Sequence, residues 1–350
     1  MNRKCLINIK KLSSIVFLFG IILNPVELSA QNPEPVYRRY TVDDGLPSST
    51  VYHVFQDSKG YMWFATANGV SRFDGYKFEN FDIQSGLVDN DVFEIYEDYK
   101  HRIWFIPMSG KLCYYENGKI VSYKYNNKIT EHIPISRGPI KCSFYVDSLD
   151  YVYLSFRRFV RIIISPEGVY KTLNSKEIEI SINVKELNKN KILVSSSSSP
   201  NARYVYFEGL YQNFKISMKE LSGFDIAGHY HLYFIAQPDS SIILSLSQSI
   251  VKLKNGKIIS KRRYKDDIIW LSTDNDGNFW VAPQIGGLYC FKNGDIEKEP
   301  QKSLLNNYKI TSVLKDDEGA YWISSLNDGV FYCSDINFVN LTKENGLTDN

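Results

Sequence analysis

One pattern recurs along this chain of 350 residues: an acidic or polar turn, a tryptophan, a short apolar run, a turn containing glycine and a second apolar run. The tryptophans of the four clearest copies are Trp63, Trp104, Trp280 and Trp322. Three weaker copies have Tyr153, Leu193 and Leu244 in the same place. Self-similarity at a fixed spacing indicates one supersecondary unit copied along the chain.

A second phrase, built around Gly-Leu, gives the period independently. It reads DDGLPSS from Asp43, QSGLVDN from Gln84 and ENGLTDN from Glu344. Gly45 and Gly346 are 301 residues apart, which is seven periods of 43 residues. The phrase therefore predicts seven copies of the unit.

The first copy contains four short apolar segments separated by turn residues, which predicts a four-stranded antiparallel meander. Its segment YMWFATA is apolar almost without interruption, so both faces of the sheet are expected to be covered. Four strands in 43 residues are typical of a β-propeller blade, whereas a β-helix has a much shorter period. The sequence predicts an all-β fold, a seven-bladed β-propeller of four-stranded antiparallel blades, over residues 31–345.

The two ends of the repeat region compete for one place. Tyr37–Tyr40 and Phe338–Leu341 both read as outer strands beside the seventh blade, and continuity of the chain favours Phe338–Leu341. We expect residues 346–350 to begin a truncated eighth repeat. The ring is then closed by face packing, or by the amino-terminal strand supplanting Phe338–Leu341.

Residues 1–30 have the features of a secretory signal peptide. A basic start with Arg3 and Lys4 precedes a short apolar core, and Leu28-Ser29-Ala30 fits a cleavage site. An uncleaved membrane anchor is the alternative, although Asn24-Pro25 interrupts the apolar run. The remaining chain is expected to be exported.

Charge and cysteine content exclude several classes of partner. The net charge is +2, so no electrostatic footprint for nucleic acid is present. No two cysteines form a CxxC pair, which leaves a zinc site unsupported. Buried free thiols are expected at the four cysteines of the exported part, Cys113, Cys142, Cys290 and Cys333.

Between Gly45 and Phe73 the sequence resembles the two-component regulator propeller repeat, in which GLP-x-[ST]-x-[VI] is followed by D-x-x-G-x-[LIM]-W and a glycine-containing turn. The resemblance implies a periplasmic sensor region of a Bacteroidetes histidine kinase, of the LytS type or a hybrid sensor. It also implies a second propeller, a three-tyrosine domain, a membrane helix and a cytoplasmic kinase in the parent protein, which is expected to be a dimer. The expected ligand is a small molecule or an oligosaccharide.

Few residues are candidates for chemistry. Asp57, Asp147, Asp274 and Asp316 each begin a tight turn, where a carboxylate accepts backbone N–H bonds, so a structural role is expected. The recurring tryptophans are expected to pack between blades rather than to bind carbohydrate. No nucleophile motif, catalytic carboxylate pair or phosphate-binding glycine loop is present, so no catalytic residue, cofactor or metal is predicted.

Two local features depart from the repeat. His229 and His231 share one face of a strand and could bind metal, but no third ligand is evident, and edge packing is the simpler interpretation. Arg157 and Arg158 stand where the first copy has Ala67 and Asn68. They are the candidate ligand-binding residues, for an anionic or polar ligand; a solvated surface is the alternative.

These observations support three functional hypotheses. The first is the ligand-sensing amino-terminal part of a two-component sensor histidine kinase, without enzymatic activity of its own. The second is a stand-alone secreted propeller that binds a glycan or a protein, and the third is a propeller hydrolase or lyase.

Overall fold

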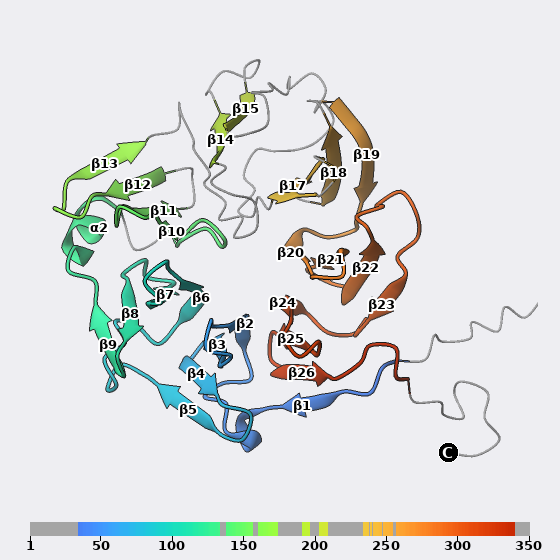
Figure 1. The fold of residues 1–350 in the computed structure, drawn as a ribbon, viewed down its shortest axis with the longest axis horizontal. Helices are drawn as coiled ribbons and strands as arrows, with labels where there is room; N and C mark the ends of the chain where they lie inside the picture. Colours follow the sequence, from blue (N-terminus) through green and yellow to red (C-terminus); the bar gives the residue numbers. More distant parts are fainter. Residues whose placement is uncertain are drawn as a thin grey trace, which may run out of the picture. The chain divides into compact units, whose positions relative to one another are not determined.

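The computed structural model describes residues 34–339, apart from 134–137, 157–159, 174–190, 197–202, 209–233, 238, 240, 247 and 255–256. Within residues 35–338, which form one compact unit, antiparallel sheets are arranged around a ring (Figure 1). In each four-stranded sheet one edge strand lies toward the centre of the ring and the other edge strand lies at its rim (Figure 1).

The first half of the unit contains three four-stranded blades. The first blade comprises β2 (Val51–Gln56), β3 (Met62–Thr66), β4 (Gly69–Phe73) and β5 (Phe78–Phe81). The second comprises β6 (Val92–Glu97), β7 (Ile103–Pro107), β8 (Cys113–Glu116) and β9 (Lys119–Ser122). After the helix α2 (Asn126–His132), the third comprises β10 (Tyr145–Val146), β11 (Val152–Phe156), β12 (Val160–Ile164) and β13 (Tyr170–Leu173).

The second half contains three more four-stranded blades, each with neighbouring strands antiparallel. One comprises β16 (Phe234–Ala236), β17 (Ile242–Leu246), β18 (Ser249–Lys254) and β19 (Lys257–Arg263). The next comprises β20 (Ile268–Thr273), β21 (Asn278–Pro283), β22 (Leu288–Lys292) and β23 (Lys302–Leu304). The last blade comprises β24 (Ile310–Lys315), β25 (Tyr321–Ser325), β26 (Val330–Cys333) and β1 (Arg38–Tyr40), which is followed by the 3-10 helix η1 (Val42–Asp44).

The number of four-stranded blades differs from the prediction. The described residues form six such blades rather than seven, together with a two-stranded sheet of β14 (Lys191–Ser196) and β15 (Arg203–Glu208). The expected anchor Leu193 lies in β14. This part of the chain has no tryptophan, so this copy rests on spacing alone, and residues 174–190 and 209–233 on either side of the sheet lie outside the described residues.

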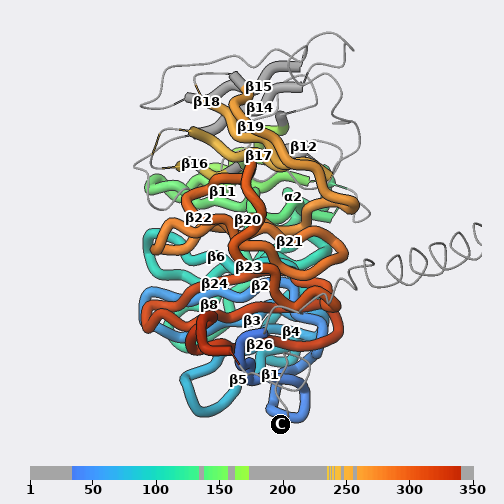
Figure 2. Tube along the Cα trace, turned by 90° about the vertical axis from the view of Figure 1, so that its right-hand side faces the viewer, coloured from blue at the N-terminus to red at the C-terminus, as the bar shows by residue number. Residues whose placement is uncertain are grey.

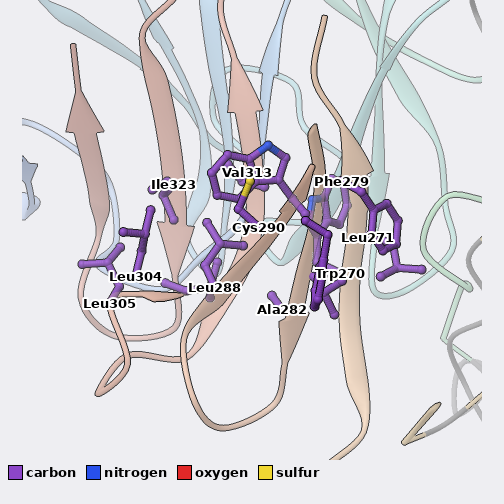
Figure 3. Packing of buried hydrophobic residues seen from close by; sticks show 14 of the residues in the cluster. Trp270, Leu271, Phe279, Ala282, Leu288, Cys290, Leu304, Leu305, Val313 and Ile323 are labelled. Atoms are coloured by element: carbon purple, nitrogen blue, oxygen red, sulfur yellow. The ribbon is translucent and has the colours of Figure 1, made fainter. Parts of the chain in front are cut away.

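Burial on both faces explains the uninterrupted apolar strands. All five residues of β3, β7 and β25 are buried. Side chains of the β20–β23 blade and the last blade form one apolar cluster, which includes Leu288 and Cys290 from one blade and Val313 and Ile323 from the other (Figure 3). These two blades thus cover each other's apolar faces, which is how a ring of blades excludes water.

The amino-terminal strand completes the last blade. β1 pairs with β26 in antiparallel register, with Arg38 opposite Tyr332 and Tyr40 opposite Val330, and the two strands lie together in both views (Figures 1 and 2). The preference for Phe338–Leu341 as this outer strand was therefore wrong. Tyr40 of β1 is buried and packs against the core of the last blade. The argument from continuity of the chain did not take this contact into account.

Candidate functional site

The aspartate-headed turns are structural. Asp57 Oδ1 accepts hydrogen bonds from the backbone N of Lys59 and Tyr61 at 3.0 and 2.9 Å, and its Oδ2 accepts one from Trp63 Nε1 at 2.8 Å. The same Asp–Trp bond recurs in three further blades, as Asp98–Trp104, Asp274–Trp280 and Asp316–Trp322. In the third blade, Tyr153 OH donates to Asp147 Oδ2 instead. These carboxylates fix the turn and orient the packed indole, which is a structural role.

Sequence reasoning missed one of these turns and misplaced one anchor. Asp98 was not singled out, although it stands six residues before Trp104 as Asp57 stands before Trp63. In the β16–β19 blade Gln237 takes the aspartate's place, because its backbone N donates to Ser241 O as that of Asp57 does to Tyr61 O. The residue equivalent to tryptophan there is Ile243, paired with Ile235, rather than Leu244.

A serine, a histidine and a carboxylate meet between the first two blades. Glu97 Oε1 lies 2.5 Å from Ser58 Oγ and 2.7 Å from His101 Nδ1, and Ser58 Oγ lies 3.0 Å from the same Nδ1. A catalytic triad needs the hydroxyl and the carboxylate on opposite ring nitrogens, so that the imidazole can pass a proton between them. Here both contact one nitrogen, and the cluster joins two turns instead.

The inner strands show a second recurrent feature, a β-bulge near the start of the strand. The register shifts between Val51 and His53 in β2, and equivalent shifts occur in β6, β20 and β24. The residues at these shifts are Tyr52, Phe93, Ile269 and Thr311. A bulge leaves one residue outside the ladder, so its carbonyl is free to bond elsewhere.

Lys141 reaches the inner strands from the connection between the second and third blades. Its Nζ donates to Tyr52 O at 2.5 Å and to Thr311 O at 3.0 Å. The same Nζ lies 4.6 Å from the ring centroid of Trp270 and 5.5 Å from that of Phe93. Lys141 is 4% exposed, so its ammonium is removed from water and held by carbonyl dipoles and aromatic faces.

Two further titratable groups are buried beside Lys141. Glu94 Oε2 accepts a hydrogen bond of 2.9 Å from the backbone N of Cys142. Burial raises the pKa of Glu94, since desolvation outweighs that hydrogen bond and the attraction of Lys141, and burial lowers the pKa of Lys141. Burial, helped by the Lys141 charge, also holds the pKa of His53 well below its usual range. His53 Nδ1 lies 3.2 Å from the backbone N of Ile95, which donates to it.

We call these residues the hub cluster: Tyr52, His53, Phe93, Glu94, Lys141, Cys142, Trp270 and Thr311. It joins the first, second, β20–β23 and last blades through one lysine. The sequence analysis did not find it, because its polar partners are mainly backbone carbonyls and its side chains come from distant copies. The signal that was available is a lysine in the apolar, non-repeating stretch that precedes the third blade.

The connections between blades form a surface of their own. Gly45 and Gly86 adopt left-handed conformations with φ of 110° and 108°, and Leu46 and Leu87, which follow them, are both 3% exposed. The connection 41–50 contacts the turn after β3, since the backbone N of Ala67 donates to Thr50 O at 3.1 Å. The blade connections and these turns therefore share one face, which we call the linker face.

The residues predicted to bind a ligand are not described. Arg157, Arg158, His229 and His231 all lie outside the described residues, and so do residues 1–30 and 346–350. Within the described ranges no three His, Cys, Asp or Glu side chains gather in a way that could hold a metal ion. No helix among the residues that the structure describes has the length and apolar character needed to cross a membrane.

Comparison with known sequences supports the repeat assignment. A family model described as a two-component regulator propeller matches residues 45–68, which confirms the resemblance seen in the first blade. A protein named histidine kinase P4, from Formosa agariphila, is 39% identical over 72 residues, which are 21% of this chain and 5% of that protein.

Solved structures of low sequence identity share the fold. The extracellular domain of a protein described as a hybrid two-component system, from Bacteroides thetaiotaomicron, has a TM-score of 0.59 at 16% identity, covering 85% of this chain and 42% of that one. The extracellular domain of a protein from the same organism, described as a one-component system, gives 0.61 at 15% identity, over 89% and 44% of the two chains. Virginiamycin B lyase from Staphylococcus aureus gives 0.59 at 13% identity, over 86% and 99%.

These matches set the limits of the assignment. The chain spans less than half the length of the two B. thetaiotaomicron domains and matches a small part of the kinase. The chain is a propeller like the extracellular regions of two-component systems. Its identity to a lyase of the same fold is equally low, so the fold alone does not assign a reaction.

Proposed function

We propose that this chain is the exported, ligand-sensing amino-terminal part of a two-component sensor histidine kinase. The match of residues 45–68 to the regulator propeller repeat carries the proposal. The histidine kinase relative and the two extracellular propellers of B. thetaiotaomicron support it. The parent protein would add a second propeller, a three-tyrosine domain, a membrane helix and a cytoplasmic kinase, and would act as a dimer.

The linker face is the surface that we propose for the ligand. Loops held by a rigid scaffold commonly carry recognition, and here the connections between blades meet the turns after β3, β7, β21 and β25 on one side. Arg157 and Arg158, which the repeat pattern aligns with Ala67 and Asn68 of the first copy, remain the proposed contacts for an anionic or polar ligand. A ligand that binds one arrangement of propeller and stalk more tightly would shift the population toward that arrangement.

We further infer that β14–β15 is part of a seventh blade. The two strands follow the third blade and precede β16 in the chain, and Leu193 lies in β14 where the period of 43 residues expects a second strand. A crystal structure of the full chain tests this inference. An inner first strand beside β14 and an outer fourth strand beside β15 would support it, and an isolated hairpin would contradict it.

The experiment for the proposed function begins with the full reading frame. We expect the parent protein, prepared in inner-membrane vesicles and supplied with radiolabelled ATP, to phosphorylate itself. The rate should change when host or dietary oligosaccharides are added on the periplasmic side, and Arg157→Ala/Arg158→Ala should remove that change while the basal rate stays. A reading frame without a kinase would instead favour the stand-alone binding propeller, and turnover of a substrate by the purified chain would favour the lyase.

A further inference from the structure

We propose that the hub of the ring is a monovalent-cation site, formed by bulge carbonyls and aromatic faces, and that the ammonium of Lys141 is its tethered occupant. Tyr52 O and Thr311 O lie 2.5 and 3.0 Å from Nζ. Trp270 and Phe93 turn their rings toward the same Nζ at 4.6 and 5.5 Å. Four strands of four blades thus converge on one positive charge.

The chemistry of these groups suits a singly charged ion. Both oxygen ligands are neutral backbone carbonyls, and the remaining contacts are the negative faces of aromatic rings. Divalent cations require several oxygen ligands in a closed shell, whereas the contacts of Nζ described here are two carbonyl oxygens and two aromatic rings. Ammonium-type ions have N–H donors that point at carbonyls, and their charge is attracted to the face of an indole, so they match it.

The charges around Nζ fit a single cation. Glu94 from β6 is the acidic group that acts on Lys141, and it is held by the backbone N of Cys142. His53 from β2 and the thiol of Cys142 lie in the same buried cluster, and both keep their neutral forms because burial opposes charge. β20 contributes Trp270 and β24 contributes the hydroxyls of Thr311 and Ser312, none of which carries charge.

The site lies at the seam where the ring closes. Thr311 Oγ1 donates to Val51 O at 2.6 Å, and the backbone N of Val54 donates to Ser312 Oγ at 2.9 Å, so β24 and β2 are joined directly. Lys141 bridges the same two strands from a third direction, because it belongs to the connection before β10. The ammonium of Lys141 therefore holds the inner strands β2 and β24 together where the ring closes. At the rim, β1 holds the first and last blades together.

Chemical rescue tests the proposal on the full chain. Lys141→Ala removes the ammonium and leaves the carbonyls unbonded, and we expect the melting temperature to fall by roughly 5–10 °C. Methylammonium chloride should restore much of that loss in a saturable manner, whereas tetramethylammonium, which has no N–H donor, should not. Lys141→Met should be destabilised without rescue, since its side chain fills the space. Lys77→Ala, at an exposed position, should behave as the unaltered chain does.

Two outcomes would overturn the cation site. One is a Lys141→Ala variant as stable as the unaltered chain; the other is an equal response to methylammonium and tetramethylammonium. If Lys141→Ala fails to fold, reductive methylation of the unaltered chain decides instead, read by peptide mass spectrometry. Lys141 should react at least 100-fold more slowly than the exposed Lys59 and Lys77, and comparable rates would contradict a buried, bonded ammonium.

Discussion

The ring of Tyr40 stacks on the indole of Trp322, with centroids 5.7 Å apart and planes inclined by 16°. Tyr40 ends the first strand of the propeller and Trp322 lies in the middle of its last blade. Tyr40 also contacts Phe73 and Phe78 of the first blade at 5.5 and 5.6 Å, so one side chain joins the two blades at the seam. The strand β1 is thus an integral part of the core.

Truncation of Tyr40 should therefore destabilise the whole ring. Tyr40→Ala removes a buried aromatic side chain from three ring contacts, and we expect the free energy of unfolding to fall by about 3 kcal/mol. Urea denaturation followed by tryptophan fluorescence measures this change. Tyr76→Ala, at a position 96% exposed, is the control and should change it by less than about 0.5 kcal/mol. Equal effects of the two substitutions would show that β1 is not packed in the last blade.

The turn carboxylates should contribute to stability through their hydrogen bonds. Asp316 is 8% exposed and accepts bonds from the backbone N of Glu318 and Ala320 and from Trp322 Nε1. Asp316→Ala leaves three donors without an acceptor, and we expect a loss of about 2–4 kcal/mol in urea denaturation. Asp317→Ala, at the exposed neighbouring position, should leave the unfolding free energy unchanged within error. A small effect at Asp316 would mean that water replaces the carboxylate in this turn.

The sequence predicted the blades wherever the Asp–Trp pair is present, because this pair is a local signal: the turn, the strand and the hydrogen bond lie within seven residues. It did not decide which strand completes the last blade. Tyr37–Tyr40 and Phe338–Leu341 have similar outer-strand patterns, and the contacts that select β1 come from Phe73 and Trp322, which are distant in sequence. Contacts between blades therefore decide which strand completes the last blade, and a repeat pattern within one blade does not show these contacts.

The hub cluster was beyond sequence reasoning for a different reason. Its essential acceptors are the carbonyls of Tyr52 and Thr311, which any residue would provide, and the bulges that free them arise from pairing between strands. Only Lys141 itself is visible in the sequence, as a lysine in an apolar stretch, and this signal does not identify the groups that it contacts. The proposed ligand residues Arg157 and Arg158 remain predictions.

Glu94 should make stability depend on pH. Burial raises its pKa from the usual 4.5 to about 7, so the folded chain holds a proton that the unfolded chain has lost in this interval. The resulting stabilisation is complete below about pH 4.5 and is lost as pH rises to about 7, with a magnitude on the order of 3 kcal/mol. Lys141 acts in a separate, alkaline interval, because its lowered pKa of about 8 costs stability as pH falls from 10.5 toward 8.

The comparison with Glu94→Gln isolates this contribution from those of other acids. The amide keeps an oxygen for the backbone N of Cys142 but does not titrate. Urea denaturation at pH 5 and pH 7.5 should show that the unaltered chain loses more stability over this interval than Glu94→Gln does. Identical pH profiles would mean that Glu94 stays ionised throughout, paired with Lys141.

Three of the four described cysteines should react only when the chain unfolds. Cys113, Cys290 and Cys333 are buried, and no disulfide links any of the four described cysteines. Burial raises the pKa of the thiols of Cys113 and Cys290 to about 12, which suppresses the reactive thiolate at neutral pH. A thiol-reactive chromophore should label these residues slowly at pH 7.5 and completely in urea. Rapid labelling of Cys290 in the folded chain would contradict its packing between two blades.

Gly329 offers a direct test of how β1 is placed. Its φ is 75°, and a Cβ at this position would lie 2.1 Å from the carbonyl oxygen of Tyr40. Gly329→Ala should therefore displace β1 from β26 and destabilise the chain by more than 2 kcal/mol, roughly the combined effect of strain and a lost edge pairing. Gly319, in the same blade, has a φ of 95°, and its nearest contact would be Lys315 Cε at 3.8 Å. Gly319→Ala thus carries the cost of backbone strain alone, about 1 kcal/mol. If urea denaturation gives the two variants the same loss, the backbone of Tyr40 does not lie against Gly329, and another segment occupies the outer place of the last blade.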